Sequence, residues 1–465
     1  MEAAGIPTLT LVRTDFIGVM KNALSGLGLA PEAAMIAFSI DLFLPDSDIS
    51  PLRERKKEIY EGLTLWKPRL SQATASESPL LRIEAENFET ALVRANHLFI
   101  TNLWGDGLPL LPATEERVNW ILEGSAFPRK HPLGIFPPRG AVVSVESCAI
   151  ALAMAGGRPE YLPLLISAVD TFLDPRAGAA ALQAASGSAF PVIVVNGPLG
   201  KQIRLSSSFG CLGPDPQRPA GASIGRALHL MQQNLGGALP GVGSMANYGA
   251  MRYTNIVIAE DDQDLPPGWL PHGQDRHGYP AGSNSLSLMF ANGAVNIRRR
   301  GAKKETAEED ALQGLYRMAD FMRTPNVAAL VGYEKGTPGI LLIPKVVAHF
   351  MARLGWSKSS LREFFWDHSR IPAEWLKRSG ADSWIEVDAS PVVLETKKLD
   401  PWPITLKPEN FAIVCAGGDH PTNSFWLQGY CPEVIGREIL LPDHFEDLLR
   451  AADRDLGCGT EACQI

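Results

Sequence analysis

Residues 190–198 read Phe-Pro-Val-Ile-Val-Val-Asn-Gly-Pro, and residues 339–345 read Gly-Ile-Leu-Leu-Ile-Pro-Lys. Each stretch is a short, continuous apolar run that stops at polar residues, glycine or proline. Such runs are typical of strands that are buried on both faces of a sheet, because a strand with one face in water alternates apolar and polar residues. The two stretches therefore predict an α/β protein with a buried central sheet.

Strand and helix patterns alternate around these two runs. We expect further strands over 254–259, 286–290 and 411–415. Helices are expected over 115–122, 145–155, 159–173, 223–234, 305–322, 346–354 and 359–367. No internal repeat at a fixed period is visible. The pattern predicts a multi-layer α/β fold with a mixed or mostly parallel central sheet, helices on both faces and an extra N-terminal segment.

Composition divides the chain into four segments. Residues 1–87 are expected to form an N-terminal extension of mixed helix and strand, which includes a Ser- and Thr-rich linker over 71–79. Residues 88–304 are expected to form the α/β core. A mainly helical segment with one strand follows over 305–400, and residues 401–465 supply a strand, a loop and a tail that complete the core.

The charge and cysteine content exclude several classes of protein. The chain has 465 residues, and 43 Lys and Arg against 51 Asp and Glu leave a formal net charge of -8. Without a basic stripe it is not expected to bind nucleic acid. No apolar run approaches the ~18 residues of a membrane helix and no signal peptide is recognisable, so we expect a cytoplasmic protein without a membrane partner. Six scattered cysteines are expected to be thiols.

Polar residues follow the predicted strands. Asn196 follows the first strand, Glu260 follows 254–259, and Gly417, Gly418 and His420 follow 411–415. Open α/β sheets bind ligands beyond the carboxyl ends of their strands. His420 is a residue type that moves protons near neutral pH, and the two glycines let the backbone approach a ligand. Strand ends are also polar simply because they reach solvent, so this second interpretation stays open.

Two other loops carry residues suited to chemistry. In the loop 268–279, His272 and His277 could ligate zinc or iron, although spacing fixes no third ligand, and His272 could instead contact substrate directly. The Ser- and Gly-rich loop 206–222 contains Cys211 and precedes a helix that Ser223 is expected to cap, an arrangement that can hold an anion. The loop 206–222 lacks the lysine and the glycine spacing of nucleotide-binding loops, so no nucleotide cofactor is predicted. Whether the protein binds a metal, and which one, stays open.

Residues 104–118 contain Trp-Gly-Asp-Gly-Leu-Pro, then Pro112 and Thr-Glu-Glu-Arg-Val. This stretch resembles the W-x-DGLP-x-x-P-x-TEERV signature of a largely uncharacterised bacterial family that is associated with UGSC-motif (seleno)proteins. Similar landmarks follow in the same order over about residues 88–445, at 145–146, 158–163, 195–198, 223–227, 234–237 and 355–358. The chain departs from the family where Gly157 replaces a cysteine and where His420 is displaced. The resemblance implies a small redox protein as partner and adds Asp106, Glu146, Glu160 and Arg226 to the residues of interest.

Our leading hypothesis is an enzyme that acts on a small polar metabolite by acid/base or thiol-assisted chemistry, as a lyase, hydrolase or transferase. The candidate catalytic residues are His420, His272, Glu260, Glu146 and Asp106. The candidate substrate-binding residues are Arg226, Asn196, Ser223, Gly417, Gly418 and Glu160. Glu146 and Glu160 can equally be structural, paired with Arg139 or Arg158.

Two alternative functions stay open. The chain could be a non-catalytic partner subunit of a small redox (seleno)protein, with its Gly- and Pro-rich loops as the docking surface. It could also be a metal-dependent hydrolase that uses His272 and His277. Assembly into a homo-oligomer is left open as well.

Overall fold

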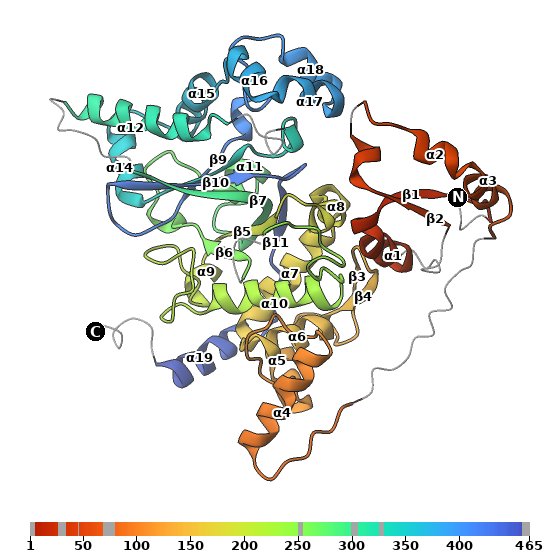
Figure 1. Cartoon of the computed structure of the whole chain (residues 1–465). Coiled ribbons are helices and arrows are strands. Elements are labelled where there is room, and N and C mark those ends of the chain that lie inside the picture. The colour runs from red at the N-terminus through yellow and green to blue at the C-terminus, as the bar shows by residue number, and fades with distance from the viewer. Residues whose placement is uncertain are drawn as a thin grey trace.

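The computed structural model describes residues 5–26, 34–44, 46–67, 80–249, 254–298, 306–324 and 330–457. The linker expected over 71–79 lies outside these residues. The described chain forms a seven-stranded central sheet, a two-stranded sheet near the N-terminus and a small hairpin, with helices around them (Figure 1). Among the helices of this described part, none is long and apolar enough to cross a membrane.

The strands of the central sheet are β5 (Phe190–Asn196), β6 (Ile256–Ala259), β7 (Ser285–Arg298), β8 (Gly339–Ile343), β9 (Ala412–Cys415), β10 (Asn423–Gly429) and β11 (Ile435–Glu438). Their order is β6-β5-β7-β10-β8-β9, and β11 pairs with β7 beside this path. The pairs β5–β6 and β8–β9 are parallel, and the other pairs are antiparallel. The sheet is therefore mixed, and the predicted α/β multilayer fold is confirmed.

The two halves of the central sheet share one topology. In the first half, β5 and β6 are parallel neighbours, and the antiparallel β7 lies on the other side of β5. In the second half, β8, β9 and β10 repeat these relationships in the same chain order. The sheet curls until its outer strands meet at their carboxyl ends, where the Asp261 N–H donates to the Cys415 carbonyl oxygen at 2.7 Å. The strand ends of both halves therefore converge on one junction.

Two hydrophobic cores flank the second half of the sheet. In β8, Ile340 and Leu342 belong to one core while Leu341 and Ile343 belong to the other, because successive strand residues point to opposite faces. The first core takes side chains from α5 (Glu115–Leu122), α6 (Val145–Met154), α7 (Leu162–Leu173) and α10 (Ala220–Asn234). The second takes them from α12 (Ala307–Met322), α14 (Lys345–Arg353) and α15 (Lys358–His368).

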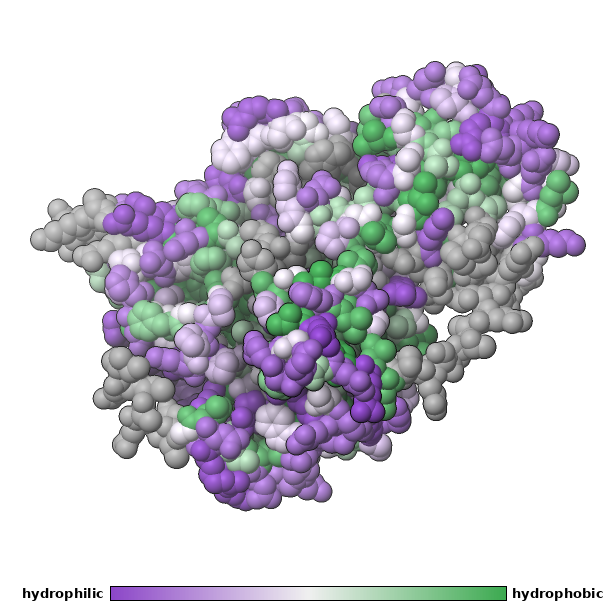
Figure 2. All heavy atoms as spheres, turned by 60° about the horizontal axis from the view of Figure 1, so that its bottom comes forward, coloured by the Kyte–Doolittle hydropathy of each residue, from purple (hydrophilic) through white to green (hydrophobic). Residues whose placement is uncertain are grey.

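The remaining elements surround this body. Near the N-terminus, β1 (Thr10–Arg13) and β2 (Met35–Phe38) form a parallel pair with α1 (Ile17–Gly26), α2 (Ser50–Glu54) and α3 (Lys56–Thr64). The others are α4 (Phe88–Thr101), β3 (Pro132–Phe136), β4 (Ala141–Ser144), α8 (Ala179–Ala184), α9 (Leu199–Gln202), α11 (His272–His277), α16 (Ala373–Ser379), α17 (Ala381–Asp388), α18 (Pro391–Thr396) and α19 (Phe445–Leu456). On the face in Figure 2, hydrophobic patches lie between hydrophilic residues.

Several elements differ from expectation. The strand expected over 286–290 extends to Arg298, because the first part of β7 pairs with β5 and β11 and its last part with β10. The helix expected from residue 159 begins at Leu162, after a 3-10 turn. Helix α10 begins at Ala220, so Ser223 lies inside its first turn and does not cap it. The predicted loop 268–279 contains the short helix α11.

Candidate functional site

A buried polar cluster lies at the junction where β6 and β9 meet. The carboxylate of Glu260 accepts a hydrogen bond from Lys358 Nζ at 3.0 Å and from Asn196 Nδ2 at 2.8 Å. It also accepts from the backbone N–H groups of His272 at 2.5 Å and Cys415 at 3.1 Å. The side chain of Glu260 is 0% exposed and that of Lys358 is 5% exposed. A buried ion pair is tolerated only when its polar atoms are fully hydrogen-bonded, and this one meets that condition for the carboxylate.

This cluster holds the start of α11. The first N–H groups of a helix have no partner within the helix. Here the His272 N–H donates to Glu260, and the Gly273 N–H donates to Asn196 Oδ1 at 2.9 Å. Lys358 Nζ also donates to the carbonyl oxygen of Leu270, just before the helix, at 2.7 Å. Because these groups are buried and their bonds point to α11, we interpret Glu260, Asn196 and Lys358 as positioning residues.

Two arginines fix the rest of α11. Arg362 of α15 forms a two-point ion pair with Asp275 and donates from Nε to the Phe411 carbonyl oxygen at 3.0 Å. Arg276 donates to three carbonyl oxygens, at 2.7 to 3.0 Å, in the loops around it. A six-residue helix has little stability of its own, so these tertiary bonds set its position.

The two histidines of α11 have lowered pKa values. Burial and the nearby Lys358 charge lower the pKa of His272 well below its ordinary value. Burial, with Arg276 nearby, lowers the pKa of His277 to about 4. Within the described part of the chain, neither ring nitrogen of His272 has a hydrogen-bond partner, whereas His277 Nε2 lies 3.1 Å from Ser287 Oγ. The described residues hold no group of three or more His, Cys, Asp or Glu arranged for a metal ion.

A small hollow opens beside α11, and we call it the Asp262 hollow. Its lining consists of Asn196, Gly197, Asp262, Pro271, Gln274, Pro280, Gly282, Ser283 and Ser285. Asp262 is the titratable residue of this lining, and its Oδ2 accepts the Gly197 N–H at 2.6 Å. Burial raises the pKa of Asp262; the Gly197 hydrogen bond opposes this, and the Glu260 charge reinforces it. The hollow therefore contains a carboxyl group that binds its proton more tightly than an exposed aspartate does, because its pKa is raised.

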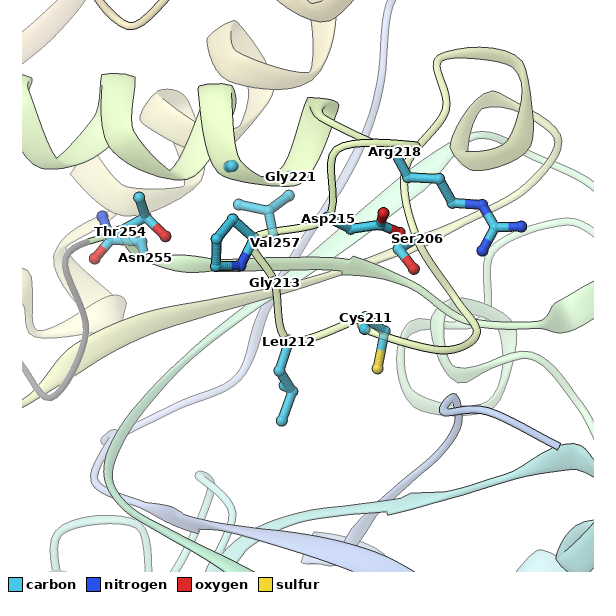
Figure 3. Close-up of a pocket in the computed structure, with 13 residues that line it drawn as sticks. Ser206, Cys211, Leu212, Gly213, Asp215, Arg218, Gly221, Thr254, Asn255 and Val257 are labelled. Carbon is cyan, nitrogen blue, oxygen red and sulfur yellow. The ribbon is translucent and has the colours of Figure 1, made fainter. Parts of the chain in front are cut away.

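A second hollow, the Cys211 hollow, lies at the start of α10 (Figure 3). Its lining includes Ser206, Cys211, Asp215 and Arg218 from the predicted anion-binding loop. Thr254, Asn255 and Val257 also line it. Gly221 is required where α10 meets β6, because a Cβ atom there would lie 2.6 Å from the Val257 carbonyl oxygen. Arg226, expected to serve this loop, is not among the residues that line the hollow.

Arg226 instead binds Asp106. Its Nε and Nη2 donate to the two carboxylate oxygens of Asp106 at 2.7 and 2.9 Å, and Nη2 also reaches the carbonyl oxygens of Leu108 and Pro109. Asn234, also on α10, donates to the carbonyl oxygen of Trp104 at 2.9 Å. The Asp106 loop is therefore fastened to α10 by side chains, which is a structural role for both predicted residues.

The other predicted residues lie apart from the α11 cluster. Glu146 pairs with Arg129 and Lys130, and Glu160 pairs with Arg158 at 2.7 Å, so each carboxylate is held in an ion pair.

The loop after β9 faces outward. His420 is exposed, and its Nδ1 lies 2.7 Å from Thr422 Oγ1. The Gly417 N–H donates to the Ser207 carbonyl oxygen at 2.9 Å, and a Cβ at Gly418 would lie 2.1 Å from the Phe209 ring. Gly417 and Gly418 therefore serve close packing between two loops.

Of the predicted residues, Asn196, Glu260 and His272 come together. The sequence interpretation missed Asp262, Lys358, Asp275 and Arg362. Asp262 had a signal, since it follows a predicted strand by three residues, whereas the Lys358–Glu260 and Arg362–Asp275 pairs join segments 98 and 87 residues apart. Comparison of the chain with protein-family profiles, with characterised proteins and with solved structures returns no match.

Proposed function

We propose that this chain is an enzyme that acts on a small polar metabolite by acid/base chemistry, with Asp262 as the group that takes up and returns the proton. The observation that carries the proposal is a half-buried carboxyl group with a raised pKa in a hollow at the carboxyl ends of two strands. Carboxyl groups tuned in this way by burial and a neighbouring charge are typical of acid/base sites.

The lining of the Asp262 hollow favours one class of substrate. The amide group of Gln274 and the hydroxyl groups of Ser283 and Ser285 belong to the lining, which contains no Lys, Arg or His. A phosphate or carboxylate group would therefore meet Asp262 without a compensating cation. The hollow has a volume of about 10 Å³, room for one water-sized group, so it would take only the reacting hydroxyl or amino group of a larger neutral or cationic substrate.

The buried cluster of Glu260, Asn196 and Lys358 positions the helix that lines the hollow. Glu260 and Asn196 hold the first N–H groups of α11, and this helix carries Gln274 into the hollow. The Gly197 N–H stabilises the ionised form of Asp262, which is the form that accepts a proton from the substrate. Once protonated, Asp262 can return the proton to a leaving group or an intermediate. Lyase, hydrolase and transferase reactions all use such a step.

A metabolite-depletion experiment tests the proposal. The full chain is incubated with a defined mixture of polyols, amino compounds, carboxylates and phosphate esters, and the mixture is followed by mass spectrometry. We expect one neutral or cationic compound to be consumed by the wild type and not by Asp262→Asn. Asp215→Asn, which alters the Cys211 hollow, is the matched control and should keep the activity. Consumption at the same rate by Asp262→Asn would overturn the proposal.

A thiol-assisted reaction is the second candidate. Cys211 lines a hollow and is half-buried, whereas Cys148, Cys415 and Cys431 are buried and burial raises the pKa of each of these thiols. In the same depletion experiment, loss of activity in Cys211→Ser with retention in Asp262→Asn would favour this candidate.

Membership of the W-x-DGLP-x-x-P-x-TEERV family is likewise a proposal. The contacts of Asp106 with Arg226 and of Trp104 with Asn234 support it, because three of the landmark segments touch one another. We also propose a cytoplasmic location, because the four cysteines of the described residues are free thiols.

A further inference from the structure

A third, larger cavity lies away from the Asp262 hollow and the Cys211 hollow. Its volume is about 540 Å³, within the roughly 300–1,000 Å³ that small-molecule sites occupy. It is lined by Leu330, Val331, Glu334, Lys335, Ala389, Ser390, Val393 and Pro432, and we call it the Glu334 cavity. These residues come from the segment before β8, from the start of α18 and from the loop between β10 and β11.

The lining divides into an apolar part and a charged part. Leu330, Val331, Ala389, Val393 and Pro432 supply the apolar surface, whereas Glu334 and Lys335 are exposed. Ser390 Oγ donates to Glu334 Oε1 at 2.8 Å, which orients the carboxylate and leaves Oε2 without an ion-pair partner in the described chain. Among the same described residues, Lys335 Nζ forms no ion pair either.

From these observations we infer that the Glu334 cavity binds a zwitterionic metabolite with an apolar side chain, of amino-acid to dipeptide size. The ammonium group of such a ligand pairs with the Glu334 carboxylate, and its carboxylate pairs with Lys335. Its side chain covers the apolar surface formed by Leu330, Val331 and Val393. A ligand with a single charge forms one of these two ion pairs, and a purely apolar ligand forms neither.

Binding at this cavity is connected to α11. Arg276 Nη2 donates to the carbonyl oxygens of Lys335 at 2.9 Å and Gly336 at 3.0 Å. The loop that contains Glu334 and Lys335 therefore lines the cavity with these two side chains and binds α11 through its backbone carbonyl groups. A ligand bound in the cavity therefore contacts the loop that also binds Arg276. The inference does not depend on the proposed function, because binding is measured without turnover.

Isothermal titration of the full chain tests the inference. L-Leucine, L-phenylalanine and the dipeptide Leu-Phe are compared with phenethylamine and 3-phenylpropionate, which each keep one charge. We expect at least one zwitterion to bind, with the single-charge analogues at least tenfold weaker. Glu334→Gln and Lys335→Gln should each weaken zwitterion binding at least tenfold, and Val331→Trp, which fills the cavity, should abolish it.

Glu395→Gln and Lys398→Gln are the matched controls, because this exposed pair belongs to α18 and the residues just after it and does not line the cavity. Circular dichroism verifies that each variant is folded. Absence of binding by all three zwitterions at millimolar concentration to the folded wild type would overturn the inference. Equal zwitterion binding by Glu334→Gln, Lys335→Gln and the wild type would overturn it as well.

Discussion

Lys358 Nζ lies 3.0 Å from Glu260 Oε1, and the two side chains are 5% and 0% exposed although 98 residues separate them in sequence. The pair joins the start of α15 to the end of β6, and Glu260 also holds the first N–H group of α11. The pair therefore holds α15, β6 and α11 together next to Asn196, which lines the Asp262 hollow.

Removing one partner of this pair should destabilise the fold strongly. Lys358→Met leaves a buried carboxylate unpaired, and Glu260→Gln leaves a buried ammonium unpaired, so each should lower the free energy of unfolding by about 3–5 kcal/mol. The double variant should lose less than the sum of the two. Denaturant unfolding measures this, with Glu363→Gln on the exposed face of α15 as the control. Single variants as stable as the control would show that the pair does not hold the junction.

The Asp106–Arg226 pair should contribute to stability and not directly to catalysis. Asp106→Asn should lower the free energy of unfolding by about 1.5–3 kcal/mol at pH 7, the range for hydrogen bonds to charged groups. Burial opposes ionisation of Asp106, but the bonds from Arg226 and Leu108 outweigh it and hold the pKa of Asp106 below its usual range. The contribution is thus complete above the unfolded pKa, about 3.9, and is lost as the pH falls through the folded pKa. A stability difference as large at pH 2 as at pH 7 would contradict this explanation.

His272 should make the protein sensitive to mild acid. Burial lowers its pKa in the folded state, so the unfolded chain binds the proton more readily. Stability is complete above the unfolded pKa of about 6.5 and declines as the pH falls below it. Urea unfolding between pH 5 and 7.5 should show this decline in the wild type and a smaller one in His272→Leu. Identical pH profiles would mean that His272 does not titrate on unfolding.

The cysteines should differ in reactivity. Cys211 is half-buried, while Cys148, Cys415 and Cys431 are buried and burial raises their thiol pKa values. Because the thiolate is the reactive form, iodoacetamide should modify Cys211 much faster than these three in the native protein. Peptide mapping by mass spectrometry measures the four rates, and denatured protein supplies the reference. Native labelling of Cys415 as fast as Cys211 would show that β9 opens readily.

Local sequence patterns predict the parts of this fold that depend on burial alone. The apolar runs in β5 and β8 identify fully buried strands, and the strand-end rule brings Asn196 and Glu260 to one junction. The same rule selects His420, which turns outward because the loop after β9 packs on Phe209 instead of closing over the cluster.

Long-range pairing explains what sequence patterns miss. The alternation of apolar and polar residues in β10 is incomplete, so its sequence does not identify it as a strand. Its position in the sheet is seen from its pairing with β7 and β8. Asp106 and Arg226 have the chemistry of catalytic residues, yet they neutralise each other across 120 residues. The shared topology of the two sheet halves lies in strand order and direction, which leave no fixed period in the sequence.

The central claim is that Asp262 exchanges a proton with the substrate, and the turnover rate of Asp262→Asn tests it most directly. Asparagine can keep the hydrogen bond from the Gly197 N–H but cannot take up a proton. With the metabolite identified by depletion, we predict that Asp262→Asn lowers kcat by about 10²–10⁴-fold, the usual contribution of a positioned acid/base group. Its stability at pH 7 should equal or exceed that of the wild type, because the raised pKa of Asp262 means that its ionisation opposes folding above the unfolded pKa. A folded Asp262→Asn protein with wild-type kcat would contradict the account.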